Sequence, residues 1–232
     1  MRFFFIIVFT FISLCVSAQQ PKVMNNPEYD DKIIHFGFSL GLNDMSFNIR
    51  RTSNFVKSDS LHADIFQLSP GFQVSVISDL RLGKYFNLRC LPGINFGQRT
   101  INFVKDNQIV TSMKLESNFI DFPLTFKYRA KRVNNYAPYL IAGSCVRFDL
   151  ASRDQYDSES QVYIRLKPFD YYIETGFGID YYLYYFKFST EIKFALGLRD
   201  VLVHDPAPGE AQYVNAINRL TSKIVMLSFH FE

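Results

Sequence analysis

Apolar and polar residues alternate along most of the chain after residue 32. Between residues 32 and 50, every second position is apolar, and the positions between are small or polar. Successive side chains of a β-strand point to opposite sides, so alternation with a period of two is typical of a strand with one apolar and one polar face. The apolar face carries Ile34, Phe36, Phe38, Leu40 and Leu42, and the polar face carries His35, Gly37, Ser39, Gly41 and Asn43.

The same alternation recurs seven more times and predicts eight strands in all. It is clearest in the second half of the chain and least regular in the fifth segment. The eight segments lie at about residues 32–50, 65–81, 85–104, 120–127, 137–150, 173–180, 186–196 and 225–231.

The expected connections between these strands alternate in length. Short ones fall near residues 82–84, 130–136 and 184–185, and long ones near 51–64, 105–111, 151–165 and 201–220. Short turns at one end and long loops at the other are typical of outer-membrane β-barrels.

A short amphipathic helix is expected in the last long connection. After Pro208 and Gly209, apolar residues recur at helical spacing. They are Tyr213, Ala216, Ile217 and Leu220. Such a helix more often caps a loop than binds a ligand.

The first residues have the pattern of a secretory signal peptide. Arg2 supplies a positive charge, Phe3–Val16 is an apolar run, and Val16-Ser17-Ala18 offers small residues for cleavage. The alternative is an uncleaved anchor, but the run is shorter than the roughly 20 residues that a spanning helix needs. We therefore expect a signal peptide at residues 1–18, a flexible arm at 19–31 and a barrel at 32–232.

Composition supports segregation of apolar residues by position. The chain has 25 Phe, no Trp and 17% aromatic residues, yet its mean hydropathy is only −0.02. That value excludes a helical membrane bundle. Without Arg2, 24 basic residues face 22 acidic ones, and a formal charge of +2 is too weak to favour nucleic acid as a partner.

The polar face carries charges in mid-strand, which favours a membrane barrel over the alternative, a soluble lipocalin-like barrel. The interior of an eight-stranded barrel is just wide enough for such side chains to fill. The charges that we place inside are Asp121, Lys127, Glu174, Asp180, Glu191, Lys193 and Arg89. We expect them to form a paired network, because an unpaired charge in a closed interior is costly.

Tyrosines gather at the short-turn end, like an aromatic girdle at a membrane interface. They are Tyr85, Tyr128, Tyr136, Tyr139, Tyr181, Tyr182, Tyr184 and Tyr185. The last strand also closes in Phe231, much as in bacterial barrels. The sequence therefore predicts an all-β fold, an eight-stranded antiparallel transmembrane β-barrel of the outer membrane, with its arm and short turns in the periplasm. Cys90 and Cys145 are expected on non-neighbouring strands and opposite faces, as free, buried thiols.

Four segments of the expected strands read HFGFSLGLNDMSFNI, SPGFQVSVISDLRLGKYFNLRCLPGINFG, ESNFIDFPLTFKYRA and APYLIAGSCVRFDLAS. Through these segments the sequence resembles the PorT family of outer-membrane proteins, over nearly the whole of the expected mature chain. The resemblance implies a component of the type IX secretion system of Bacteroidetes, which carries cargo proteins to the cell surface. It implies no catalytic residues. It also implies that the partners are other secretion proteins, which contact the arm, the turns or the loops.

Two groups of histidines are candidates for chemistry. His35 shares the interior face of the first strand with Ser39, and His230 is expected nearby. This set allows an outer-membrane lipid-modifying enzyme as an alternative function, and a surface adhesion barrel is a third. A hydrogen-bonded interior pair is the simpler interpretation.

The second group lies in the long loops, where His62 and His204 have acidic neighbours. These are Asp59, Asp64 and Asp205. Their spacing matches no compact metal motif. We therefore assign no catalytic, cofactor-binding or metal residues from the sequence.

Overall fold

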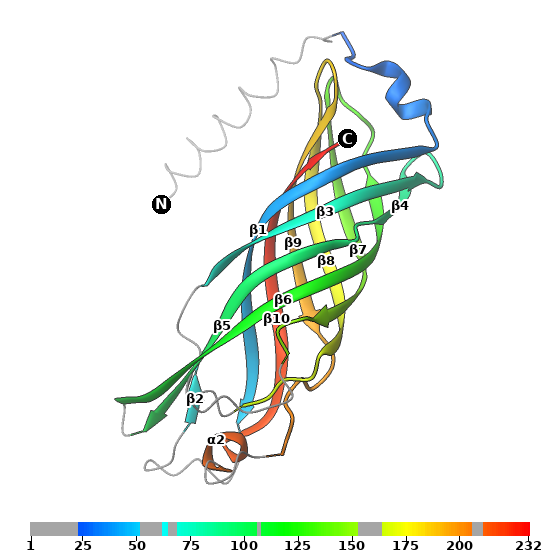
Figure 1. Cartoon of the computed structure of the whole chain (residues 1–232). Helices are drawn as coiled ribbons and strands as arrows, with labels where there is room; N and C mark the ends of the chain where they lie inside the picture. Colours follow the sequence, from blue (N-terminus) through cyan, green and yellow to red (C-terminus); the bar gives the residue numbers. More distant parts are fainter. Residues whose placement is uncertain (1–22, 52–61, 65–68, 106–107, 153–163, 206–210) are drawn as a thin grey trace, which may run out of the picture.

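Antiparallel strands close into a ring in the computed structural model, which describes residues 23–51, 62–64, 69–105, 108–152, 164–205 and 211–232 (Figure 1). The strands are β1 (Ile34–Arg51), β2 (His62–Asp64), β3 (Pro70–Arg81), β4 (Phe86–Cys90), β5 (Gly93–Lys105), β6 (Gln108–Arg129), β7 (Tyr136–Asp149), β8 (Phe169–Tyr182), β9 (Lys187–Gly197) and β10 (Ile217–Phe231). The helices are the 3-10 helix η1 (Pro27–Asp31) and α2 (Ala211–Asn215). Neither helix in this described part of the chain is long and apolar enough to cross a membrane.

The predicted barrel is confirmed, and β1 closes the ring by pairing with β10 on one side and β3 on the other. The segment predicted as one strand at 85–104 divides into β4 and β5 at Leu91-Pro92, because proline has no N–H to donate to a ladder. The register with β6 nevertheless continues across the break, from Cys90↔Leu124 to Gly93↔Asp121. The two strands therefore fill one position in the ring.

The prediction of a long connection at residues 105–111 is wrong. β5 runs to Lys105 and β6 begins at Gln108, and these two residues pair with each other. Together the strands form a hairpin that extends away from the ring, at the lower left of Figure 1. Ile101 and Phe103 are fully buried in this hairpin, and their packing carries the strand beyond the expected end. The short strand β2, which pairs with β5, also falls where a loop was expected.

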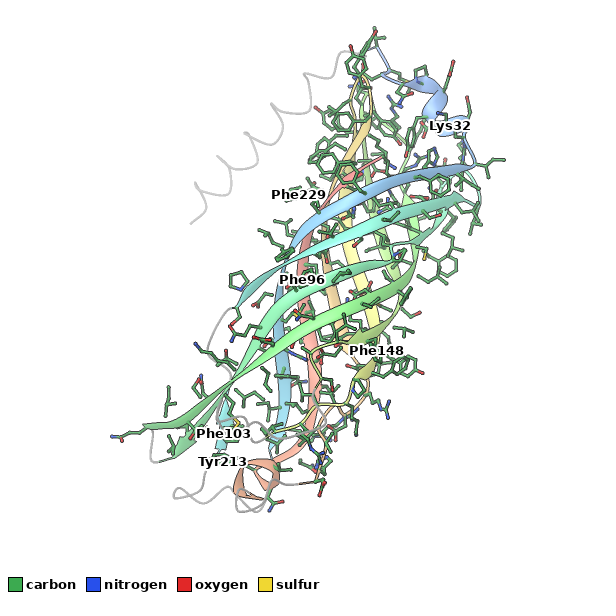
Figure 2. The ribbon with its side chains drawn as sticks, in the orientation of Figure 1. Lys32, Phe96, Phe103, Phe148, Tyr213 and Phe229 are labelled. Carbon is green, nitrogen blue, oxygen red and sulfur yellow. The ribbon has the colours of Figure 1, made fainter. Side chains whose placement is uncertain are left out.

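The apolar face of each strand points outward in the middle of the barrel. On β1, Phe36 is 70% exposed whereas its neighbour His35 is 7% exposed. Figure 2 shows Phe96, Phe148 and Phe229 along this outer surface. An exposed apolar surface of this extent marks a contact with a membrane or with another protein. We call it the apolar band; its exposed members on β1, β3 and β6 are Ile34, Phe36, Phe38, Leu40, Leu42, Phe72, Val74, Val76, Phe122, Leu124 and Phe126.

The pattern inverts toward the end that carries the long loops. On β1, Met45 and Phe47 are buried, while Asn48 and Arg50 point outward. On β10, Leu220 is buried while Lys223 is exposed. We call this part the loop-end zone. Its outside is polar and its inside is apolar, as in a protein domain surrounded by water.

Two of the eight tyrosines expected in the girdle point inward instead. Tyr139 and Tyr182 are 3% and 1% exposed. Adjacent strand residues face opposite sides, so Tyr181 and Tyr182 cannot both face lipid. Tyr128, Tyr136, Tyr184 and Tyr185 are exposed at the short-turn end as predicted.

The helix expected near Tyr213 is present but shorter. It covers Ala211–Asn215, and Ile217 and Leu220 belong to β10. The prediction of free thiols on opposite faces is confirmed, but that of burial is right only for Cys145, because Cys90 is half-exposed on the outer face. The expected signal peptide, residues 1–18, lies outside the described residues.

Candidate functional site

Charged side chains fill the interior of the barrel behind the apolar band. Arg89 is completely buried and contacts three carboxylates, Asp79, Glu191 and Glu232, each at 3.2 Å. They come from β3, from β9 and from the position directly after β10. One guanidinium group therefore links opposite walls of the ring.

A second set lies beside the first. Lys127 donates to both carboxylate oxygens of Asp180, at 2.9 and 2.8 Å, and its ammonium lies 3.8 Å from the centre of the Tyr139 ring. Lys187 pairs with Glu232 at 2.7 Å. Glu232 is thus shared between Arg89 and Lys187.

A third set fills the middle of the barrel. Arg147 contacts Asp121 at 3.0 Å and Glu174 at 2.7 Å, and Lys193 contacts Glu174 at 3.2 Å. Nearer the loop-end zone, Arg99 pairs with Asp149 at 3.1 Å.

The predicted pairing of the interior charges is confirmed, because each charge named from the sequence forms an ion pair. The sequence did not identify Asp79, Arg147, Lys187 and Glu232 as partners. All these side chains are nearly inaccessible, so they occupy the space that a pore would need.

The short-turn end is closed by residues 25–31, which we call the N-terminal plug. Tyr29 is 6% exposed; its ring stacks on His35 at 4.0 Å and its hydroxyl donates to Glu232 at 2.8 Å. Burial, together with the nearby Glu232 carboxylate, raises the pKa of the Tyr29 hydroxyl well above its usual range. The hydroxyl therefore stays a hydrogen-bond donor.

Polar contacts hold the rest of the plug. Asp30 accepts from Arg129 at 2.6 Å, and the Asn25 backbone N–H donates to the side-chain oxygen of Asn135 at 2.9 Å. Arg132 also donates to the Asn25 carbonyl. The expectation of an unstructured arm is therefore wrong for these residues; residues 19–22 lie outside the described part. The plug is ordered for two reasons. The fixed φ of Pro27 favours the first turn of a helix, and Tyr29 is buried.

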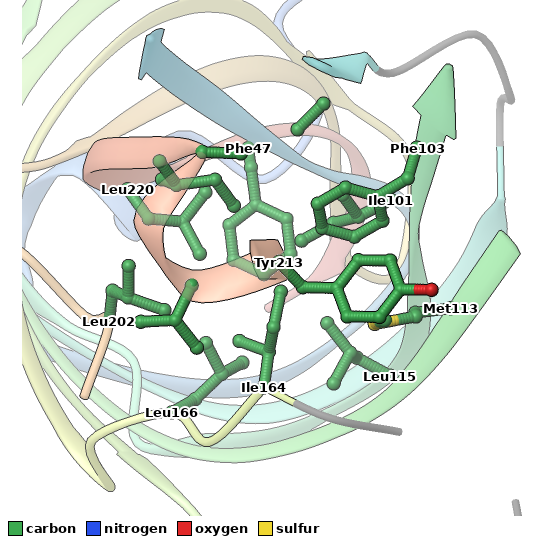
Figure 3. Close-up of a cluster of buried hydrophobic side chains, with 14 of the residues drawn as sticks. Phe47, Ile101, Phe103, Met113, Leu115, Ile164, Leu166, Leu202, Tyr213 and Leu220 are labelled. Atoms are coloured by element: carbon green, nitrogen blue, oxygen red, sulfur yellow. The ribbon is translucent and has the colours of Figure 1, made fainter. Parts of the chain in front are cut away.

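The loop-end zone is closed by a cluster of buried apolar side chains (Figure 3). Tyr213 on α2 packs edge-on against Phe103 of the protruding hairpin, with ring centres 4.8 Å apart. We call this the cap cluster: Phe47, Ala63, Ile101, Phe103, Met113, Leu115, Ile164, Leu166, Val201, Leu202, Tyr213, Val214, Ala216, Ile217 and Leu220. The helix is thus a loop cap, as the sequence indicated.

Asp200 fixes the polar side of this cap. One carboxylate oxygen accepts the backbone N–H groups of Leu202 at 3.2 Å and Leu220 at 3.0 Å, and the other contacts His204 at 2.9 Å. Partial burial opposes ionisation, but the hydrogen bonds from His204 and the two backbone groups lower the pKa of Asp200. The connection after β9 is therefore tied to β10.

The histidines of the barrel interior do not form a catalytic arrangement. Ser39 lies opposite His230 in the β1–β10 register, but its hydroxyl has no hydrogen-bond partner. The Nε2 of His35 lies 2.9 Å from the Tyr29 carbonyl oxygen, and that of His230 lies 3.4 Å from Glu191. No described base is therefore hydrogen-bonded to Ser39, as a nucleophile requires.

The loop histidines are also separated. His204 contacts Asp200, and Asp205 pairs with Arg165 at 2.7 Å. Asp59 lies outside the described residues, and only the backbone of His62 and Asp64 is described. Within the described ranges, no three His, Cys, Asp or Glu side chains converge as metal ligands would.

Comparison with known families gives a match over residues 18–203 to the outer membrane protein beta-barrel domain. The chain belongs to this family. The barrel therefore lies in the outer membrane, with its apolar band against the lipid. Because short turns of such barrels face the periplasm, we expect the N-terminal plug on the periplasmic side and the cap cluster on the extracellular side.

Similar solved structures are also outer-membrane barrels. Neisserial surface protein A is 8% identical, covers 86% of this chain and 98% of its own, with a TM-score of 0.43. OprG from Pseudomonas aeruginosa is 13% identical over 86% of this chain and 93% of its own, with a TM-score of 0.47. Ail of Yersinia pestis is 9% identical and covers 86% of this chain and 98% of its own, with a TM-score of 0.36. No curated protein sequence matches the chain.

Proposed function

We propose that this barrel is a non-enzymatic outer-membrane protein that acts through its two folded ends rather than through a lumen. The observation that carries the proposal is the filled interior, in which Arg89, Lys127 and Glu174 are completely buried in ion pairs. A solute or an unfolded chain has no path through such an interior without breaking these pairs. Function is then left to the surfaces that the barrel presents on each side of the membrane.

The process that we propose is type IX secretion of cargo proteins to the cell surface. The support is the resemblance to the PorT family, which is spread over many strand positions. A filled barrel suits an accessory or assembly component better than a conduit. Its partners would be other secretion proteins that contact the periplasmic plug, the short turns or the surface loops.

Deletion of the gene tests this proposal. Cargo proteins should disappear from the cell surface and accumulate inside the cell, and the intact gene should restore them. Total cargo level and outer-membrane protein profile serve as controls. Normal surface display in the deletion strain would contradict the secretion role and leave the fold conclusions intact.

A second candidate function is binding at the cell surface. It is favoured by the hairpin of β5 and β6, where Ile109 and Val110 are 62% and 56% exposed near the tip. Exposed apolar residues on a protruding element suit contact with another surface. Replacing both by serine should reduce cell attachment without changing secretion; unchanged attachment would argue against this candidate.

A further inference from the structure

Four basic side chains lie on the outer surface of the loop-end zone, on β1, on β10 and just after the end of β9. We call them the basic patch: Arg50, Arg199, Arg219 and Lys223. All four are exposed. Arg50 and Arg219 lie directly opposite each other in the β1–β10 register, so both point to the same outer face.

This arrangement places like charges together. Like charges directly opposite on neighbouring strands are destabilising. Arg219 also donates to the Leu198 carbonyl at 2.7 Å, which holds its guanidinium next to Arg199. The patch is therefore a concentration of positive charge that an anion would stabilise.

The basic patch has no carboxylate partner in the part of the chain that the structure describes. Among the described residues, none of its four members forms an ion pair with a carboxylate. Asp44, on the neighbouring part of β1, accepts the Ser69 backbone N–H at 3.0 Å. On β6, by contrast, the outward-facing Lys114 and Glu116 carry both signs. The excess of positive charge thus belongs to one side of the barrel.

The patch lies at the edge of the apolar band. On β10, Val225 is the next outward-facing residue after Lys223, roughly 7 Å along the strand, and Leu227 follows it. On β9, the exposed Leu196 lies opposite Lys223. In the membrane this level corresponds to the headgroups of the outer leaflet, with acyl chains beside Val225, Leu227 and Leu196.

We propose that the basic patch binds the phosphate groups of a phosphorylated glycolipid in the outer leaflet. The planar guanidinium of arginine matches phosphate with two parallel hydrogen bonds. Arg50, Arg199 and Arg219 supply the phosphate contacts, while the adjoining apolar band contacts the acyl chains. This site is independent of the proposed secretion function.

Lipid binding by the full folded protein in a neutral detergent tests the proposal. The probes are lipid A carrying its phosphates and the same lipid A after enzymatic dephosphorylation, with affinity measured by native mass spectrometry. The double variant R50Q/R219Q should bind the phosphorylated lipid about tenfold more weakly. The matched control K114Q should bind it like the unchanged protein, and the dephosphorylated lipid should bind all three proteins weakly.

Thermal unfolding supplies a second readout that separates lipid binding from folding. In detergent alone, R50Q should keep or raise the melting temperature, because the substitution removes a repulsion. Adding the phosphorylated lipid should raise the melting temperature of the unchanged protein more than that of R50Q. Equal affinity for both lipids, or an equal rise for both proteins, would overturn the proposal.

Discussion

The apolar band and the loop-end zone are built on the same strands but have opposite interiors. The apolar band faces lipid, so its outward-facing side chains are apolar. Because side chains alternate along a strand, the inward-facing ones are polar or charged, and they form ion pairs. The loop-end zone faces water, so its outward-facing side chains are polar. Its inward-facing side chains are apolar and form the cap cluster. β10 shows both patterns, with Leu220 inside at one end and His230 inside at the other. The solvent around each part of a strand thus determines what fills the ring beside it.

The two interiors should respond differently to the loss of one side chain, most strongly in the charged one. Arg89→Met leaves the carboxylates of Asp79, Glu191 and Glu232 without their shared cation. Breaking a buried ion-pair network in this way should reduce the free energy of unfolding by about 3 to 5 kcal/mol. Urea unfolding of the barrel in lipid vesicles measures the loss.

The exposed Lys114→Met is the matched control for that variant, and its change should stay within about 0.5 kcal/mol. If Arg89→Met were as stable as this control, the charged interior would not hold the barrel together.

In the apolar interior, the equivalent change is Leu202→Ala. Leu202 is fully buried in the cap cluster, and a leucine-to-alanine cavity lowers stability by about 2 to 5 kcal/mol. The effect should be local: limited proteolysis should cut the long-loop end faster, while the folded barrel keeps its heat-modifiable migration on a gel. Leu198→Ala, at a side chain that is 51% exposed, should leave proteolysis unchanged. Loss of the whole barrel in Leu202→Ala would show that the two zones are not separable.

At the short-turn end, Tyr29→Phe removes one hydroxyl and leaves the ring in place. The Glu232 carboxylate loses a buried donor, which should destabilise the docked plug by about 1.5 kcal/mol. Hydrogen exchange of the amides in residues 25–31 should become faster, and that in β6 should not change. Unchanged exchange in the plug would mean that ring stacking on His35 and the polar contacts of Asp30 are sufficient to hold the plug in place without the Tyr29 hydroxyl.

The smallest effect concerns the pH dependence of the cap cluster. The pKa of Asp200 is lowered in the folded protein, so its contribution to stability is present above its unfolded pKa, roughly 3.9. That contribution is lost as the pH falls through the lower folded value. Protease resistance of the loop end should therefore decline below about pH 4, and Asp200→Asn should flatten the decline. A pH profile identical in both proteins would contradict this role.

Alternation along the strands was enough to predict the barrel, its closure between the first and last strands and the charged interior. It failed where contacts between distant segments decide the structure. Strand β5 runs on to Lys105 because Phe103 packs against Tyr213 of α2. Tyr139 and Tyr182 point inward because their strand positions face Lys127 and Arg129 in the interior. Sequence reasoning also named acids and bases without their partners, since Arg147 meets Asp121 only through the pairing of β6 with β7.

The N-terminal plug also constrains the order in which the barrel is assembled. Tyr29 contacts His35 on β1, Glu232 after β10 and Lys187 at the start of β9, whose ammonium lies 4.7 Å from the tyrosine ring. These three groups come together only when β1 has paired with β10. We infer that docking of Tyr29 follows closure of the ring, so an undocked segment 25–31 marks a barrel that has not yet closed.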